Sequence, residues 1–300
     1  MLRPVPVGKR ILGKRKFPVS IDGAAAFDDA VENCALAGFA PDHPFITRQT
    51  NIITIGSCFA QNIARAFFEN NYNVTRLNVG ERLFNPFALQ DFTERLVSPD
   101  HDFSAFVEHW SLPEEQILAA RQVLTSGAVV IITLGLSFVW YDNTTEEIIF
   151  DPMKKVGVHL LLRHPDRYEM RATGVPENTL ALKRIVDALR RANPLTKVIF
   201  TLSPLPMSIS VCDYPVAAAD AISKATLRCA LHEITKAKLE EVYYYPSYEV
   251  LRGMASMVDL IWFEDGLLSH IRRAWTDYAL SKFMAAYCEG EQALPPPLKA

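Results

Sequence analysis

The sequence predicts an α/β protein whose parallel sheet carries helices on both faces. Apolar runs typical of strands alternate along the chain with segments whose apolar residues recur at helical spacing. The connections between them are short. This alternation indicates a parallel sheet, because parallel neighbours need a crossover connection that a helix supplies.

The elements follow one another in a regular order. We expect strands over residues 52–56, 128–135, 197–204 and 242–248. We expect helices over residues 61–71, 113–126, 178–194, 220–238 and 276–290.

Small and polar residues gather where each predicted strand ends, which is where sites in parallel sheets lie. They are Gly56-Ser57-Cys58, Gly135-Leu136-Ser137, Ser203-Pro204 and Pro246-Ser247-Tyr248-Glu249. Turns favour Gly, Pro and Ser for structural reasons, so these residues at the exit of a single strand, where the strand ends, are weak evidence of a functional site. The four exits together predict a site at this edge of the sheet.

The domain organisation follows from the segments outside this alternation. We expect an N-terminal arm over residues 1–44, a domain over 45–290 and a disordered, proline-rich tail over 291–300. Residues 143–171 interrupt the alternation. They form either an insertion near the site, in which 146–150 and 168–171 pair as a hairpin, or an ordinary surface excursion.

The composition excludes several classes of protein. With 49% hydrophobic residues among 300, the chain can bury a full core. The 31 basic and 34 acidic residues give a net charge of −3, so no basic field indicates nucleic acid or an anionic membrane as partner. The longest charge-free apolar stretch, residues 126–141, is too short to span a membrane.

The five cysteines have irregular spacing and no C-x-x-C pair. A structural zinc site or a disulfide framework is therefore not expected, and a cytoplasmic location fits best. Nothing indicates a metal or an organic cofactor, and the oligomeric state is left open.

Ser57 and Cys58 stand where the first predicted strand meets the first predicted helix. A serine there either caps the helix, which is the commoner role, or acts as a nucleophile aided by the N–H groups of the first turn. Cys58 is the rival nucleophile. We expect Cys58 to pack inward, because free cysteine is usually a small buried hydrophobe, and we favour Ser57.

Six segments resemble the GSCFA family, a group related to the SGNH/GDSL hydrolases. The resemblance runs from about Phe45 to Tyr287 through TIGSCFAQNIA, LNVGERLFNPFAL, ITLGLSFVWYD, FTLSPLPMSIS, ISKATLRCA and VYYYPSYEVL. It implies a flavodoxin-like, SGNH hydrolase-like three-layer α/β/α fold. SGNH enzymes share conserved sequence blocks. The resemblance implies that Ser57 is the serine of the first block and that Gly135 is the glycine of the third block. It also implies that Gly80 is the glycine of the second block, whose backbone N–H helps to form the oxyanion hole.

The chain departs from the SGNH pattern near the third block. SGNH enzymes have an asparagine two residues after the third-block glycine, and here that position is Ser137, followed by Phe138. Either Asn85 supplies the missing donor, or it is only a turn residue before Pro86, which we favour. Tyr248 and Glu249 are candidates for substrate binding.

The segment 262–275, called the late loop below, also departs from the SGNH pattern. SGNH enzymes supply the base and its orienting carboxylate as Asp-x-x-His, but here Leu268 stands three residues after Asp265. Either the loop is longer and His270 is the base, or the base is lost. Both interpretations remain open.

Lys224 and Arg228 share one face of a predicted helix. They either meet an anionic substrate or sugar, or form a solvated or ion-paired face, which we favour.

Two functions of different classes follow. The first is a serine esterase or acyltransferase that acts through Ser57 on an O-acetylated sugar or glycan. The second is a catalytically degenerate SGNH-like protein that binds a saccharide or a protein partner. A cysteine-dependent enzyme acting through Cys58 is a third possibility.

Overall fold

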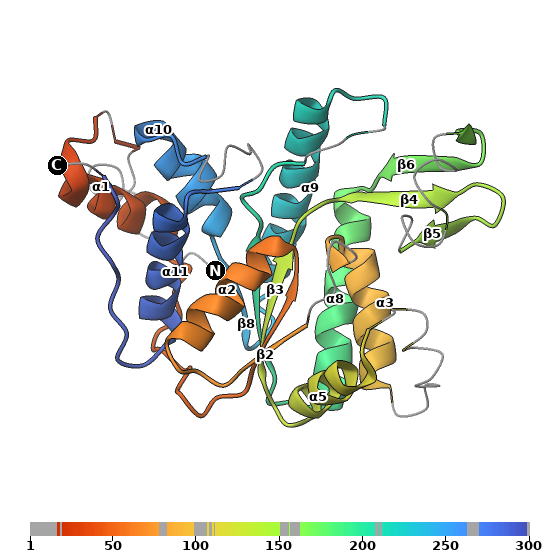
Figure 1. Cartoon of the computed structure of the whole chain (residues 1–300), viewed down its shortest axis with the longest axis horizontal. Helices are drawn as coiled ribbons and strands as arrows, with labels where there is room; N and C mark the ends of the chain where they lie inside the picture. The colour runs from red at the N-terminus through yellow and green to blue at the C-terminus, as the bar shows by residue number, and fades with distance from the viewer. Residues whose placement is uncertain are drawn as a thin grey trace.

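The protein is built around a central parallel sheet with a flavodoxin-like strand order. The computed structural model describes residues 17–298 except 19, 78–82, 99–106, 108–109, 111, 151–155, 157–162, 208–209, 211 and 263–269. Within this range the sheet has the order β2-β1-β3-β7-β8 (Figure 1). Its strands are β1 (Ile52–Gly56), β2 (Val74–Arg76), β3 (Val129–Leu134), β7 (Lys197–Leu202) and β8 (Val242–Tyr245).

The strand order fixes where a site can form. Each neighbouring pair in this sheet is parallel, and counted along the chain the order is that of flavodoxin. The predicted fold class is therefore confirmed. The order reverses between β1 and β3, so the crevice beyond the carboxyl ends of these two strands is the expected position of a ligand.

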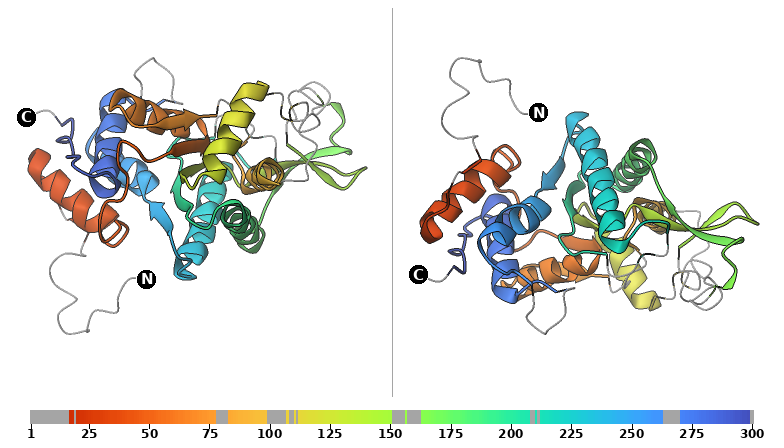
Figure 2. Two further views of the ribbon diagram at one scale, coloured as in Figure 1. Left: turned by 90° about the horizontal axis from the view of Figure 1, so that it is seen from below. Right: turned by 90° about the horizontal axis from the view of Figure 1, so that it is seen from above.

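Helices cover both faces of the sheet, as Figures 1 and 2 show. Side chains alternate along β1, so Ile53 and Ile55 pack on one face and Ile52 packs on the other. The first face is covered by α3 (Pro86–Val97), α5 (Glu114–Thr125), α8 (Val175–Ala192) and α9 (Val216–Lys236). The second is covered by α2 (Cys58–Glu69), η4 (Glu249–Ala255) and α11 (Arg273–Tyr287). A short helix, α10 (Ser256–Val258), continues η4. None of the helices in the described ranges could cross a membrane.

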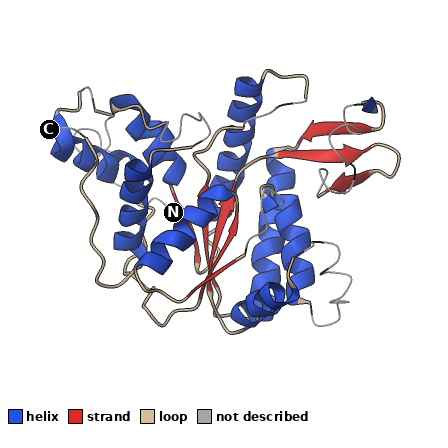
Figure 3. Cartoon of the chain, in the orientation of Figure 1, coloured by secondary structure: helices blue, strands red, loops and turns tan. Residues whose placement is uncertain are grey.

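A three-stranded antiparallel sheet projects beyond the carboxyl edge of the main sheet (Figure 3). It consists of β4 (Phe138–Asp142), β5 (Glu147–Ile149) and β6 (Tyr168–Ala172). The expected hairpin differs in one respect, because β5 and β6 each pair with β4 and not with each other. The insertion therefore begins at β4, directly after the exit of β3.

Both terminal segments pack more than the sequence predicts. Within the expected arm, α1 (Gly23–Val31) and η2 (Glu32–Leu36) lie against α11, and the rings of Phe27 and Trp275 are 5.4 Å apart. In the expected disordered tail, Leu294 donates its N–H to Ser281 Oγ at 2.8 Å, and Leu298 joins the same core. The segments 23–36 and 291–298 are thus parts of the domain.

Gly56 allows the ends of β1 and β3 to approach closely. Its φ is +123°, a region that favours glycine. A Cβ at this position would lie 3.0 Å from the carbonyl carbon of Thr133 and closer still to its oxygen. No other residue fits here without displacing β3.

We therefore predict that Gly56→Ala lowers the free energy of unfolding by about 4 kcal/mol or more, because it forces the two strands apart. Gly23→Ala is the matched control, since Gly23 also has a positive φ of +78° but no atom within 4 Å of the added Cβ. The control should lose only the backbone term, about 1–2 kcal/mol. Equal losses in urea denaturation of the two variants would contradict the proposed clash.

Candidate active site

Ser57 occupies the junction between β1 and α2, at the carboxyl edge of the sheet. Its backbone is extended, with φ −63° and ψ 171°, and it stands at the N-cap of α2. Its N–H donates to the carbonyl of Thr133 on β3 at 3.0 Å, and its carbonyl accepts from the N–H of Ala60 at 2.8 Å. The Ser57 N–H cannot also bind an oxyanion in this conformation, because the carbonyl of Thr133 on β3 already accepts from it.

The hydroxyl of Ser57 is buried and does not cap the helix. The side chain makes no capping hydrogen bond, and the residue is only 4% exposed. Among the residues that the structure describes, Oγ has no hydrogen-bond partner. Such a group costs about 1–3 kcal/mol of stability, which favours a functional role over capping. A substrate reaches this oxygen only if the groups that cover it move.

Cys58 is exposed, so the expectation that it packs inward is wrong. The buried face of α2 begins instead with Phe59 and Ala60. Cys58 lies one position earlier, about 100° round the helix axis from Phe59, and therefore faces away from the core. Packing gives no reason to prefer Ser57 over Cys58, and the preference now rests on the buried, unpaired hydroxyl.

Gly135 forms the wall beside Ser57. It follows β3, and a Cβ added to it would lie 3.5 Å from the Cβ of Ser57 and 3.3 Å from that of Phe84. Its N–H donates to the carbonyl of Phe84 at 2.8 Å. The structure thus brings together Ser57 and Gly135, which the sequence places at separate strand exits. Gly80 lies outside the described residues.

Ser137 is fully buried two residues further on. Its N–H donates to Ser223 Oγ at 2.8 Å, and its carbonyl accepts from the N–H and the hydroxyl of Thr173. Its own Oγ is buried with no partner within the described part of the chain. Ser137 therefore keeps a free hydroxyl in the segment where SGNH enzymes carry an amide donor.

Asn85 caps α3. Its Oδ1 accepts from the N–H of Ala88 at 2.9 Å, and Pro86 takes the first helical position. The favoured interpretation, a turn residue before Pro86, agrees with this geometry. Any oxyanion contact from Asn85 would have to come from Nδ2, since Oδ1 is an acceptor.

Glu249 lies in an ion-pair cluster beyond β8. It accepts from Arg228 Nε at 2.5 Å and from the hydroxyl of Tyr244 at 2.7 Å. The expectation that Arg228 is ion-paired is confirmed. Tyr248 precedes η4, and the guanidinium of Arg252 lies 5.6 Å from its ring. A substrate contact by Glu249 would therefore compete with an existing pair, whereas Tyr248 has no such competitor.

The late loop starts beside this cluster. Residues Trp262 and Ile271 form an antiparallel bridge, which holds the two ends of the loop together. The guanidinium of Arg252 lies 5.9 Å from the Trp262 ring. His270, next to the bridge, is exposed, and Asp265 lies outside the described residues. The roles of His270 as the base and of Asp265 as its orienting carboxylate therefore stay predictions.

Lys224 is buried, which the favoured sequence interpretation did not predict. It is 2% exposed, and its Nζ donates to the carbonyl of Gly135 at 2.7 Å. The expected solvated or ion-paired face is wrong at this position. Burial lowers the pKa of Lys224 from 10.5 to about 8, while the carboxylate of Asp220 opposes that shift. The spacing of Asp220 and Lys224, one helical turn apart, was the available signal.

Asp220 joins Lys224 to the cluster around η4. Its Oδ2 pairs with Arg252 Nη1 at 2.6 Å, and its Oδ1 accepts from the N–H of Met207 at 2.9 Å. The thiol of Cys58 is close enough to Lys224 to affect the pKa of the lysine. Charged groups from α9 and η4 therefore meet near Gly135, at the exit of β3.

A groove of about 400 Å³ opens between the antiparallel insertion and the loop before α9. Trp140 and Met170 are a cross-strand pair and Tyr168 shares their face, while Asp213 and Tyr214 line the opposite side. Phe138, which directly follows Ser137, also lines it. The groove thus starts at the same exit of β3 as the serine site.

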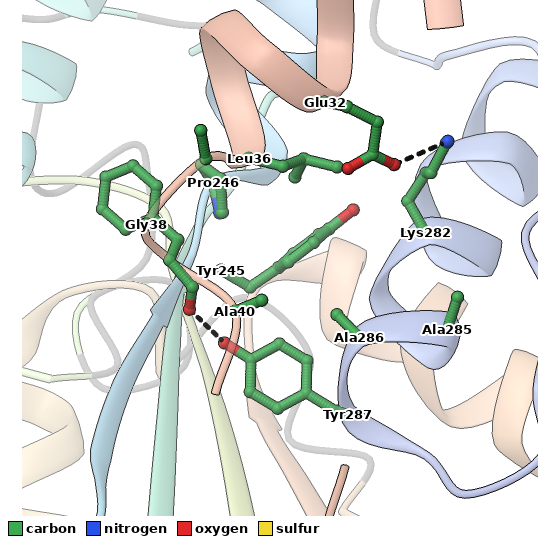
Figure 4. A pocket seen from close by; sticks show the side chains of 12 residues that line it. Glu32, Leu36, Gly38, Ala40, Tyr245, Pro246, Lys282, Ala285, Ala286 and Tyr287 are labelled. Atoms are coloured by element: carbon green, nitrogen blue, oxygen red, sulfur yellow. Dashed lines mark hydrogen bonds and ion pairs between the residues drawn. The ribbon is translucent and has the colours of Figure 1, made fainter. Parts of the chain in front are cut away.

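A second cavity, of about 290 Å³, lies between η2, the end of β8 and α11 (Figure 4). Its polar groups are paired within the protein. Lys282 binds Glu32 at 2.8 Å, and the Tyr287 hydroxyl donates to the carbonyl of Phe39 at 3.3 Å, as the figure shows. The side chains of Lys282 and Tyr287 are therefore satisfied without a ligand. Within the described ranges, no three His, Cys, Asp or Glu side chains could hold a metal ion.

The strand order defines a flavodoxin-like α/β protein, and a buried serine, Ser57, stands at the switch point of its sheet. The chain belongs to the GSCFA family, whose model matches residues 51–283.

Several solved structures are similar at a distance. A GDSL-like lipase from Bacteroides thetaiotaomicron is 14% identical, with a TM-score of 0.39 over 79% of this chain and 87% of that chain. A family 3 carbohydrate esterase from Clostridium thermocellum is 10% identical, with a TM-score of 0.36 over 80% and 95% of the two chains. Similarities this distant assign no activity. No curated protein matches the sequence.

We predict that Ser57→Ala leaves the free energy of unfolding unchanged or raises it by about 1 kcal/mol, because it removes a buried hydroxyl that has no partner. Asn85→Ala is the matched control, since Asn85 does cap its helix, and it should lose about 1 kcal/mol. If both variants lose stability equally in chemical denaturation, Ser57 is a structural cap.

Proposed function

We propose that this protein is a serine esterase or acyltransferase that acts through Ser57 on an O-acetylated sugar or glycan. The observation that carries the proposal is the buried Oγ of Ser57 at the switch point of the sheet, which has no hydrogen-bond partner among the described residues. Gly135 and the positive end of α2 adjoin this side chain. These are the surroundings that an oxygen nucleophile and the anion it forms require.

In the proposed reaction, Ser57 Oγ attacks the ester carbonyl, and His270 accepts the serine proton. Asp265 orients the imidazole, as the family resemblance implies. The tetrahedral oxyanion is held by the Gly80 N–H and by the buried hydroxyl of Ser137. The alcohol leaves with the proton from His270, and water or a second hydroxyl then takes the acyl group. Water gives hydrolysis, and another hydroxyl gives transfer.

The groove beside Ser137 supports a sugar as the alcohol part. Trp140 and Tyr214 offer aromatic faces, and the carboxylates of Glu169 and Asp213 can accept hydrogen bonds from hydroxyl groups. Apolar ring faces combined with a few acceptors suit a sugar ring better than a lipid chain. The groove begins at Phe138, so a sugar lying in it would present its ester toward Ser57.

A binding protein without chemistry is the second candidate. The enclosure of Ser57 Oγ favours it, since a substrate cannot reach the oxygen in this conformation. The ion pair that occupies Glu249 points the same way. In that case the groove would bind a saccharide, and Ser57 would leave it unchanged.

The direct test is acetate release from acetylated saccharides. We predict that Ser57→Ala lowers kcat/KM at least about 1,000-fold, and that His270→Ala does so by a comparable factor, because both take part in the attack. Cys58→Ser should retain activity. Unchanged activity in Ser57→Ala would exclude the proposed mechanism. Loss of activity only in Cys58→Ser would identify a cysteine enzyme.

The groove can be tested separately. We predict that Trp140→Ala raises KM for an acetylated disaccharide about tenfold, because the sugar loses an aromatic surface, while 4-nitrophenyl acetate is cleaved as before. Phe68→Ala is the control, since Phe68 is an exposed aromatic residue on α2 outside the groove. Equal effects of Trp140→Ala on both esters would show that the groove does not bind the sugar.

A further inference from the structure

Lys224 is buried where an apolar side chain would be expected. It lies on α9 and is 2% exposed. Its ammonium group donates to the carbonyl of Gly135, the residue that lies against the Ser57 side chain. A buried charge is retained only at a considerable cost in desolvation. A single hydrogen bond to a carbonyl does not by itself explain a lysine at this position, because a neutral donor could make the same bond.

Among the residues that the structure describes, the charges around Lys224 do not balance. Asp220 is the carboxylate on its own helix, and Arg252 of η4 already pairs with it at 2.6 Å. Within the described residues this cluster therefore holds two cations and one carboxylate. The neighbouring pair of Arg228 and Glu249 is neutral in itself. In this part of the chain one positive charge is in excess, and it lies on the far side of Gly135 from the Ser57 side chain.

The dipole of α2 is a second source of positive electrostatic potential at the side chain of residue 57. Residue 57 stands at the N-terminus of α2, where the helix dipole is positive. A negative charge that develops on the side chain of residue 57 would thus meet both the helix terminus and the ammonium beyond Gly135. In a buried setting such a charge is little screened, so its effect reaches past the first contact.

We infer that Lys224 is a positioning residue of the serine site. Its ammonium group holds Gly135 in place beside the side chain of residue 57 and stabilises negative charge on that side chain. This inference rests on the proposed function, since it assigns the lysine a role in the attack by Ser57. It adds a residue on α9 to the proposed serine site.

The inference has a consequence for pH. Among the described residues, the ionisable groups that influence the pKa of Lys224 are Asp220 on its own helix, Arg252 on η4 and Cys58 on α2. Burial, the largest influence, lowers the pKa of Lys224 to about 8. The ammonium is therefore present at neutral pH and is lost as the pH rises through about 8, so its stabilising effect on an anion should fade above that value.

The test uses a thiol as a probe of the potential at position 57. In the full chain, Ser57→Cys is combined with Cys58→Ser, and the pKa of the new thiol is measured from its ultraviolet thiolate absorbance. The Cys58→Ser variant alone is subtracted to remove the other cysteines. We expect Lys224→Met to raise the thiol pKa by about one unit or more, and Lys224→Arg to restore it in part.

An unchanged thiol pKa in folded Lys224→Met would overturn the inference. Circular dichroism checks folding, and Asp220→Asn gives a second measurement of opposite sign, since removing the carboxylate should lower the thiol pKa. No shift in Asp220→Asn would also count against the inference. Because the thiol protein is studied without substrate, this result is independent of acetate release, and either proposal can fail alone.

Discussion

The contact between the carboxyl ends of β1 and β3 is the constraint on which the rest of the site depends. The positive φ of Gly56 and its missing Cβ let the chain pass against Thr133, whose carbonyl then accepts the N–H of Ser57. This bond fixes where α2 begins and holds Ser57 beside Gly135. The flavodoxin-like order makes β1 and β3 the neighbours at the switch point, so one glycine joins the fold to the candidate chemistry.

Several buried hydroxyl groups lie close to this contact without partners in the described part of the chain. Ser57 and Ser137 are two of them, and Thr54 and Thr133 on the neighbouring strands are two more. A core built for stability alone would satisfy or replace such groups, because each one costs free energy. Their presence at one edge of the sheet, together with the excess positive charge near Lys224 among the described residues, supports the proposal that a ligand binds at this edge.

The sequence predicted the central strands and most of the helices because their signals are local. Buried parallel strands such as β3 are continuous apolar runs, and helices such as α8 show a clear apolar period. What it missed depends on contacts between distant segments. The short strand β2 has little apolar pattern, and the exposure of Cys58 depends on the rotation of α2. The burial of Lys224 depends on how α9 packs on β7 and β8, which brings its ammonium group to Gly135.

The account's central claim is that Ser57 is an activated nucleophile, and a fluorophosphonate probe tests it most directly. The measurement is the intact mass of the treated protein, followed by peptide mapping, with Ser57→Ala treated in parallel. The account predicts a single adduct on Ser57 that is absent from the variant. A well-folded protein that forms no adduct, or one that carries the adduct on another residue, would contradict it.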